Sequence, residues 1–108
     1  MMDQEVKATW VARLRSGQDK QGTNALRWED GSMCCLGVLA EVCGVPRQLL
    51  MEHYKYSFPN MPVEMAGSGA PPPGFAGLTA KDMLHLVRLN DRFGKTFPQI
   101  ADWIEENL

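Results

Sequence analysis

The chain has 108 residues, of which 44% are hydrophobic and 22% charged, and its formal net charge is −2 at pH 7. These values predict one globular domain, residues 1–108, that buries a modest core. They exclude binding to nucleic acid or to a membrane surface through the net charge of the whole protein, and no apolar run approaches the roughly 20 residues that span a bilayer.

The opening residues, MMDQE, are polar and acidic and lack the basic and then apolar layout of a secretory signal. We therefore expect a cytoplasmic protein whose thiols stay reduced. The chain has three cysteines, an odd number that agrees with this expectation, because three thiols cannot all pair within one chain.

A helix is predicted over residues 3–16, which begin with a good capping residue, Asp3, and are followed by Gly17. Apolar residues recur in it every four positions. The next segment, residues 17–33, has no helical period. Asp30-Gly31 is a tight-turn signal within it, so we expect a short β-hairpin near residues 25–35, with arms at 25–28 and 32–35.

Residues 36–43 predict a helix that is apolar nearly all round and therefore buried. Gly44 and Pro46 are the residues expected after its end, and a helical turn is expected from Pro46 to His53. Residues 54–77 are rich in Pro, Gly and Met. We expect an irregular loop there, of a composition that also suits binding.

Two more helices are predicted, over residues 79–93 and from Thr96 onward. Each starts with a Thr cap that is followed three residues later by Asp82 or Gln99. The apolar face of the first comprises Met83, Leu84, Leu86, Val87, Leu89 and Phe93. The predicted fold class is therefore α+β and mainly α, with about four helices and the short hairpin.

The stretch SMCCLGVLAEVCG, residues 32–44, holds every cysteine of the chain. Zinc ligands usually lie two to four residues apart and number about four, whereas Cys34 and Cys35 are adjacent and Cys43 is two turns away. A nucleophilic cysteine needs an electropositive, partly exposed setting, and this setting is apolar. We therefore expect no metal and no cofactor, and expect these cysteines to pack as small hydrophobic side chains.

Asn90 projects from the apolar face of the helix at 79–93, with Asp91 at its edge. A buried amide needs partners, which gives two alternatives: the pair ties down the backbone of residues 17–33, or it lines a ligand pocket. A polar group could complete a pocket that takes an anion, although it matches no phosphate-binding motif. That group comprises Lys20, Gln21, Asn24 and Arg27.

The opposite face of the same helix carries a basic stripe, which we define as Lys81, His85, Arg88 and Arg92. Such a stripe is usually solvated, but it can receive a phosphate or an acidic partner. Trp103 is a second interface candidate. The end of the chain is acidic, and its contact with the basic stripe, within one chain or between two, is a hypothesis that would allow a homo-oligomer.

Three pieces of the chain, WVARLRSGQDKQG, DGSMCCLGVLAEVCGV and LVRLNDRFGKTFPQIADWIEENL, resemble a family of small, largely uncharacterised phage and prophage proteins. The combination of CCLGVL, LND and FPQIADWIE carries the resemblance, which spans most of the chain outside residues 47–78. It implies an accessory protein of the host cytoplasm that counters a host defence. The residues it marks are Lys20, Gln21, Cys34, Cys35, Asn90 and Asp91.

No catalytic motif is recognisable, so binding is favoured over catalysis. The first hypothesis is a phage-type accessory protein that sequesters an anionic, nucleotide-like molecule with Lys20, Gln21, Asn24, Arg27, Asn90 and Asp91. The second is an inhibitor that binds a host protein through the basic stripe or Trp103. A thiol-dependent enzyme is the third.

Overall fold

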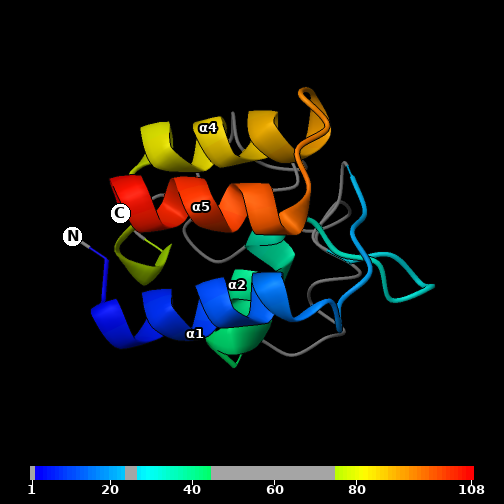
Figure 1. The fold of residues 1–108 in the computed structure, drawn as a ribbon, viewed down its shortest axis with the longest axis horizontal. Coiled ribbons are helices and arrows are strands. Elements are labelled where there is room, and N and C mark those ends of the chain that lie inside the picture. The colour runs from blue at the N-terminus through cyan, green and yellow to red at the C-terminus, as the bar shows by residue number, and fades with distance from the viewer. Residues whose placement is uncertain (1, 24–26, 45–74) are drawn as a thin grey trace.

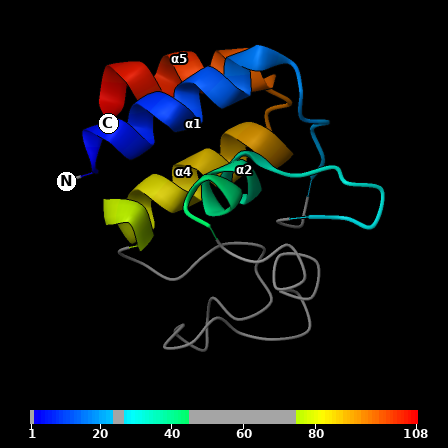
Figure 2. The ribbon, with the colours of Figure 1, turned by 90° about the horizontal axis from the view of Figure 1, so that it is seen from below.

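The structure is a computed structural model that describes residues 2–23, 27–44 and 75–108. These residues form four α-helices and one short 3-10 helix: α1 (Gln4–Ser16), α2 (Cys35–Val42), η2 (Phe75–Gly77), α4 (Ala80–Asp91) and α5 (Phe97–Asn107). α1 and α5 run antiparallel in one layer, and α2 and α4 form the other (Figures 1 and 2). α1 packs against α5 and α2, and α4 packs against the same two helices.

The predicted helix ends are confirmed within one or two residues. The Asp3 side chain accepts from the backbone N–H groups at the start of α1, and Gly17 ends that helix with a φ of 76°, a conformation that suits glycine. Thr79 and Thr96 both form complete capping boxes, with Asp82 and Gln99 respectively. These local contacts satisfy N–H groups that a helix start would otherwise leave unpaired.

The core forms around α2, in which every residue from Cys35 to Ala40 is buried. The Trp10 indole N–H donates to the Cys35 backbone oxygen at 2.9 Å, which joins the start of α2 to α1. From α4 and α5, Leu86 and Ile104 add fully buried side chains. α2 has no charged residue before Glu41, which explains why it lies inside the molecule.

The expected β-hairpin is wrong: the residues that the structure describes contain two isolated β-bridges and no strand. The tight turn itself is present, because the Gly31 N–H donates to the Trp28 oxygen at 2.9 Å. The arm after the turn is too short for a ladder, since Cys35 already begins α2. Part of the other arm, residues 24–26, lies outside the described residues.

Met33 makes both bridges: an antiparallel one with Arg27, between the expected arms, and a parallel one with Gln21, in a segment that precedes the expected hairpin. Its N–H donates to the Lys20 oxygen at 2.9 Å, and its oxygen accepts from the Gly22 N–H at 2.8 Å. The protein is therefore helical with irregular connections, and the α+β class is corrected to mainly α. The expected turn at residues 46–53 and the expected loop as far as residue 74 lie outside the described residues.

The apolar face predicted for α4 is partly wrong. Met83, Leu86 and Asn90 are buried, so the inner face follows these three positions. Leu84 is 50% exposed because it lies about 100° round the helix from Met83. Phe93 is 59% exposed because it follows the end of α4.

Among the described helices, none is both long enough and apolar enough to cross a membrane.

Candidate functional site

Asn90 is the polar centre of the molecule, with 2% of its surface exposed. Its amide nitrogen donates to the Gly22 backbone oxygen at 2.8 Å and to an Asp91 carboxylate oxygen at 2.7 Å. Its amide oxygen accepts from the Cys35 N–H at 3.2 Å and from the Gln21 side chain at 3.0 Å. An amide can donate twice and accept twice, so these four bonds use the whole capacity of Asn90.

These contacts join three elements at one point: the last turn of α4, the first N–H of α2 and the segment at residues 21–22. The Gln21 amide also donates to the Lys95 backbone oxygen at 2.8 Å, which ties the same segment to the turn after α4. Asn90 therefore does hold the backbone of the segment at residues 17–33, which was one of the two roles open to it.

The other residues expected at an anion site lie apart from Asn90 or are paired. The Lys20 ammonium is 3.0 Å from Asp30 on the surface. The Arg27 guanidinium contacts Glu41 at 3.4 Å and the Met33 sulfur at 3.5 Å. Asn24 lies outside the described residues. The structure thus gathers Gln21, Asn90 and Asp91, and gives Lys20 and Arg27 other partners.

Glu41 connects two arginines, a role that the sequence did not indicate. Arg13 contacts Glu41 at 2.8 Å and Asp19 at 3.0 Å, and Arg27 approaches Glu41 from the other side. The hydrogen bonds that Arg13 donates to Asp19, and then to Glu41, raise the pKa of Arg13. This chain of charges fastens the segment after α1 to α2. The one available signal was that Glu41 is the lone charge in an apolar helix.

The Cys34 and Cys35 thiols are buried, whereas Cys43 is exposed. Burial raises the pKa of Cys34 to about 12 and that of Cys35 well above its ordinary range, because a thiolate is poorly solvated there. The Cys35 thiol is a weak donor to the Leu86 backbone oxygen, with the Sγ and oxygen atoms 3.7 Å apart. This setting opposes nucleophilic chemistry at neutral pH. In the described ranges, no group of three or more His, Cys, Asp or Glu side chains could hold a metal ion.

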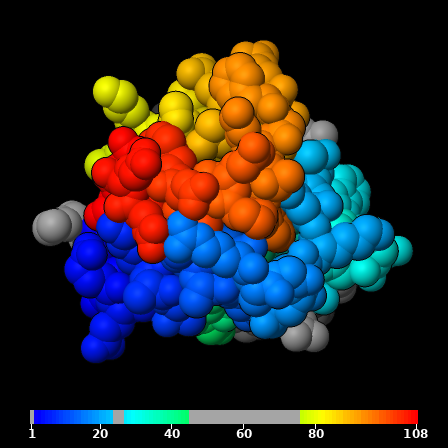
Figure 3. Space-filling model, viewed as in Figure 1, coloured from blue at the N-terminus to red at the C-terminus, as the bar shows by residue number. Residues whose placement is uncertain are grey.

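The basic stripe lies on the outer face of α4, where all four of its residues are exposed. Within the described part of the chain, the side chains of Lys81, Arg88 and Arg92 make no ion pair or hydrogen bond. α4 lies along the upper margin of the molecule in Figure 3. The exposed Leu84 lies beside these cations, and the exposed Phe93 follows them.

The acidic end of the chain does not neutralise this stripe within the protein, contrary to one hypothesis from the sequence. Arg15 of α1 contacts Asp102 at 2.6 Å and Glu105 at 3.0 Å instead. The hydrogen bond from Arg15 lowers the pKa of Glu105. α1 packs against α5 on the side away from the basic stripe (Figure 1), which is why Arg15 reaches these carboxylates.

His85 is the member of the stripe that has a partner. Its ring stacks on Trp103, with centroids 4.5 Å apart and planes 26° apart. Trp103 also lines a surface groove of about 260 Å³ between the end of α4 and α5. The structure thus brings together two of the predicted partner-binding residues from different helices. The other lining residues are Leu89, Lys95, Gln99, Asp102 and Glu106.

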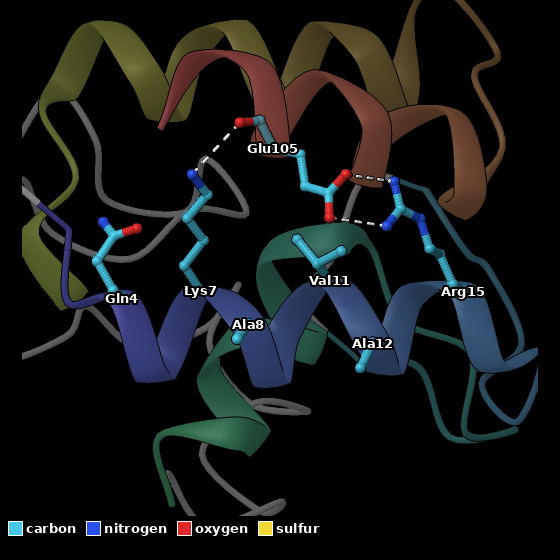
Figure 4. A pocket seen from close by; sticks show the side chains of 7 residues that line it. All are labelled: Gln4, Lys7, Ala8, Val11, Ala12, Arg15 and Glu105. Atoms are coloured by element: carbon cyan, nitrogen blue, oxygen red, sulfur yellow. Dashed lines mark hydrogen bonds and ion pairs between the residues drawn. The ribbon is translucent and has the colours of Figure 1, made fainter.

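A larger hollow, of about 530 Å³, lies between α1 and α5 (Figure 4). Lys7 reaches the Glu105 backbone oxygen at 3.4 Å, and Arg15 holds the Glu105 carboxylate. These contacts engage Lys7, Arg15 and Glu105, and the Gln4 amide donates to the Met2 oxygen at 3.0 Å, so the polar side chains that line the hollow have partners within the protein. Its lining comprises Gln4, Lys7, Ala8, Val11, Ala12, Arg15 and Glu105. We therefore place the candidate site on α4.

The chain belongs to a family described as a domain of unknown function (DUF8296), whose model matches residues 2–108. No curated protein matches the chain, and no solved structure matches it. The family match spans the pieces on which the resemblance to known proteins rested. The family description names no activity, so we infer the function from the geometry of this chain.

Proposed function

We propose that this member of the DUF8296 family is a binding protein whose basic stripe on α4 takes an acidic surface of a partner protein. In this proposal it acts without catalysis, as a phage-type accessory protein in the cytoplasm of a host cell. The phage context and the counter-defence role come from the resemblance of CCLGVL, LND and FPQIADWIE. The binding role comes from α4.

The observation that carries the proposal is the contrast between the stripe and the other arginines. Arg13, Arg15 and Arg27 each contact at least one carboxylate. Lys81, Arg88 and Arg92 are exposed and have no such partner among the described residues. A row of unpaired like charges along one helix face repels itself, and an acidic partner would remove that repulsion while guiding association.

Two features favour a protein over a nucleic acid as the partner. Leu84 and Phe93 are 50% and 59% exposed beside the cations, and apolar side chains next to arginines are typical of protein interfaces. The net charge of −2 would also repel a polyphosphate at long range. The expected partner therefore presents carboxylates together with apolar side chains.

A pull-down with matched charge variants tests this function. Arg88→Gln with Arg92→Gln removes two cations of α4 that have no carboxylate partner among the described residues, and Lys7→Gln with Arg15→Gln removes two cations from α1. Both variants lower the net charge equally. We expect the α4 variant to lose one identified host protein that the wild type and the control variant retain. Binding of that protein to the wild type should weaken as the salt concentration rises. Equal retention by both variants, or recovery of nucleic acid alone, would contradict the proposal.

Sequestration of an anionic, nucleotide-like molecule is the second proposal. What supports it is that Asn90 lies within hydrogen-bonding distance of both Gln21 and Asp91. A ligand there must displace internal bonds, because Asn90 has no remaining donor. Native mass spectrometry of protein purified from a host should show a bound mass that Lys20→Gln and Gln21→Ala remove, and an unliganded mass would end this proposal.

A homo-oligomer would use the acidic residues of a second chain, of which Asp102 and Glu105 already bond to Arg15. Light scattering at low and high salt tests this alternative, and a monomer at both would exclude it. The thiol enzyme has the least support, since Cys34 and Cys35 are buried.

A further inference from the structure

We infer that the basic stripe fits an acidic α-helix of the partner, lying along α4 with carboxylates at the same three- and four-residue spacing. This inference rests on the proposed function and specifies the partner's chemistry and shape. It is carried by the spacing of the cations on α4, by the exposed apolar side chains beside them, and by the stacked pair at their edge.

The four basic residues follow one line along α4. They are four, three and four residues apart, so they lie within about 60° of one another around the helix and span about 16 Å along it. α4 itself runs without a break from Ala80 to Asp91, and Arg92 is its C-cap. The row is therefore fixed by one rigid element.

A partner helix matches this row better than a strand does. A helix with acidic residues at the same spacing repeats the same rises along its axis, so each of Lys81, Arg88 and Arg92 faces one carboxylate. A strand places side chains of one face about 6.7 Å apart. Over about 16 Å, a strand with one carboxylate opposite Lys81 would place its third about 3 Å from both Arg88 and Arg92 along the axis. Charge complementarity thus favours a helix.

The exposed apolar side chains supply the affinity that exposed ion pairs do not. Exposed ion pairs contribute about 0–1 kcal/mol each, so charges set orientation more than affinity. Leu84 flanks the first half of the row, and Phe93 lies just beyond the last cation. A helix along α4 would cover both with apolar residues of its own beside its acidic row.

The stacked rings of His85 and Trp103 mark the edge of the docking surface and provide a fluorescence signal for binding. His85 packs on Trp103 of α5 at 4.5 Å, so α4 presents that imidazole in a fixed position. A helix on α4 would also shield part of the half-buried Trp103 from water. Its binding should therefore change tryptophan emission, and the change should be smaller in Trp103→Phe.

Two synthetic peptides of one composition test the inference on the full chain. The first is a helical alanine-based peptide with Glu at four, three and four residue spacing and two Leu residues beside that row. The second carries the same residues with the Glu distributed around the helix. Circular dichroism confirms equal helicity, and titration calorimetry with fluorescence measures the Kd values.

We expect the patterned peptide to bind at least about tenfold more tightly than the distributed one. The Arg88→Gln, Arg92→Gln variant and Leu84→Ala should each remove most of that difference, while Lys7→Gln with Arg15→Gln keeps it. Lys7 is half-buried and the other substituted residues are exposed. Exposed ion pairs contribute about 0–1 kcal/mol, so every variant is expected to fold. Equal affinity for both peptides, binding of neither, or tighter binding of a short DNA duplex would overturn the inference. The proposed function fails separately, if the α4 variant retains the host protein as well as the wild type does.

Discussion

At the scale of the residue, Asn90 decides whether three elements stay together. Asn90→Ala would leave the Gly22 oxygen and the Cys35 N–H without the partners that they have now. Each unsatisfied buried group costs about 1–3 kcal/mol, so we expect a loss of about 3 kcal/mol in the free energy of unfolding. Asn90→Asp should lose about as much at pH 7, because it cannot donate and would face Asp91. Urea denaturation measures both.

Asn107→Ala is the matched control for that prediction. Its amide also donates to a backbone oxygen, that of Trp103 at 2.8 Å, but Asn107 is exposed. Surface substitutions usually change stability by less than about 0.5 kcal/mol. If Asn90→Ala were as mild as this control, Asn90 would not be a structural residue, and the sequestration proposal would gain.

The three cysteines should differ sharply in reactivity. Cys34 and Cys35 are buried with raised pKa values, and Cys43 is exposed. Because alkylation needs an accessible thiolate, iodoacetamide should add once to the folded protein and three times in urea, as counted by mass spectrometry. The folded Cys43→Ser variant should take no label. Rapid labelling of Cys34 or Cys35 at neutral pH would revive the thiol-enzyme hypothesis.

At the scale of the element, the sequence predicted those features whose causes are local. Thr79 with Asp82, and Thr96 with Gln99, lie within one turn of each other and fix two helix starts. The expected hairpin stops, within the described residues, at the bridge between Arg27 and Met33, because Cys35 already begins α2. The sequence did not indicate that Met33 also bonds to Lys20 and Gly22, which lie well before the turn. Hydrogen bonds between residues that are distant along the chain produce no hydrophobic period in the sequence, so the sequence pattern cannot predict them.

The candidate site shows the same division. The helical period placed Lys81, Arg88 and Arg92 on one face, and they do share it. It also assigned Leu84 to the core, because a stripe of apolar residues does not reveal how wide the buried face is. That the acidic end pairs with Arg15 of α1 depended on how α1 and α5 pack, which no local pattern contains.

The segment that carries Gly22 packs too closely for a side chain. A Cβ at Gly22 would lie 2.8 Å from the Ser32 hydroxyl and 3.1 Å from a Trp28 ring carbon. We expect Gly22→Ala to cost about 1–3 kcal/mol by overpacking, measured by urea denaturation. Adding Ser32→Gly should recover part of that loss, and Gln18→Ala, on the exposed surface nearby, should be neutral. No recovery would mean that the strain lies elsewhere.

At the scale of the whole molecule, the two helices farthest apart in sequence are joined by Arg15. Its hydrogen bond lowers the pKa of Glu105 below 4.5, and Ser32 and then Lys20 hold the pKa of Asp30 well below 3.8. A carboxyl with a lowered pKa in the folded protein binds protons more readily once unfolded. Stability is therefore greatest above the ordinary pKa and falls as the pH drops through about 4 toward the folded values.

Arg15→Gln removes the hydrogen bond that lowers the pKa of Glu105. The free energy of unfolding should therefore depend less steeply on pH between about 5 and 3 than in the wild type. Arg92→Gln removes an arginine with no carboxylate partner among the described residues and should keep the wild-type slope. Urea denaturation at a series of pH values measures both, and added salt should reduce the difference because the pair is exposed. If Arg15→Gln kept the full slope, the acid sensitivity would arise at Asp30 or elsewhere, and Arg15 would join α1 to α5 without setting the response of the fold to acid.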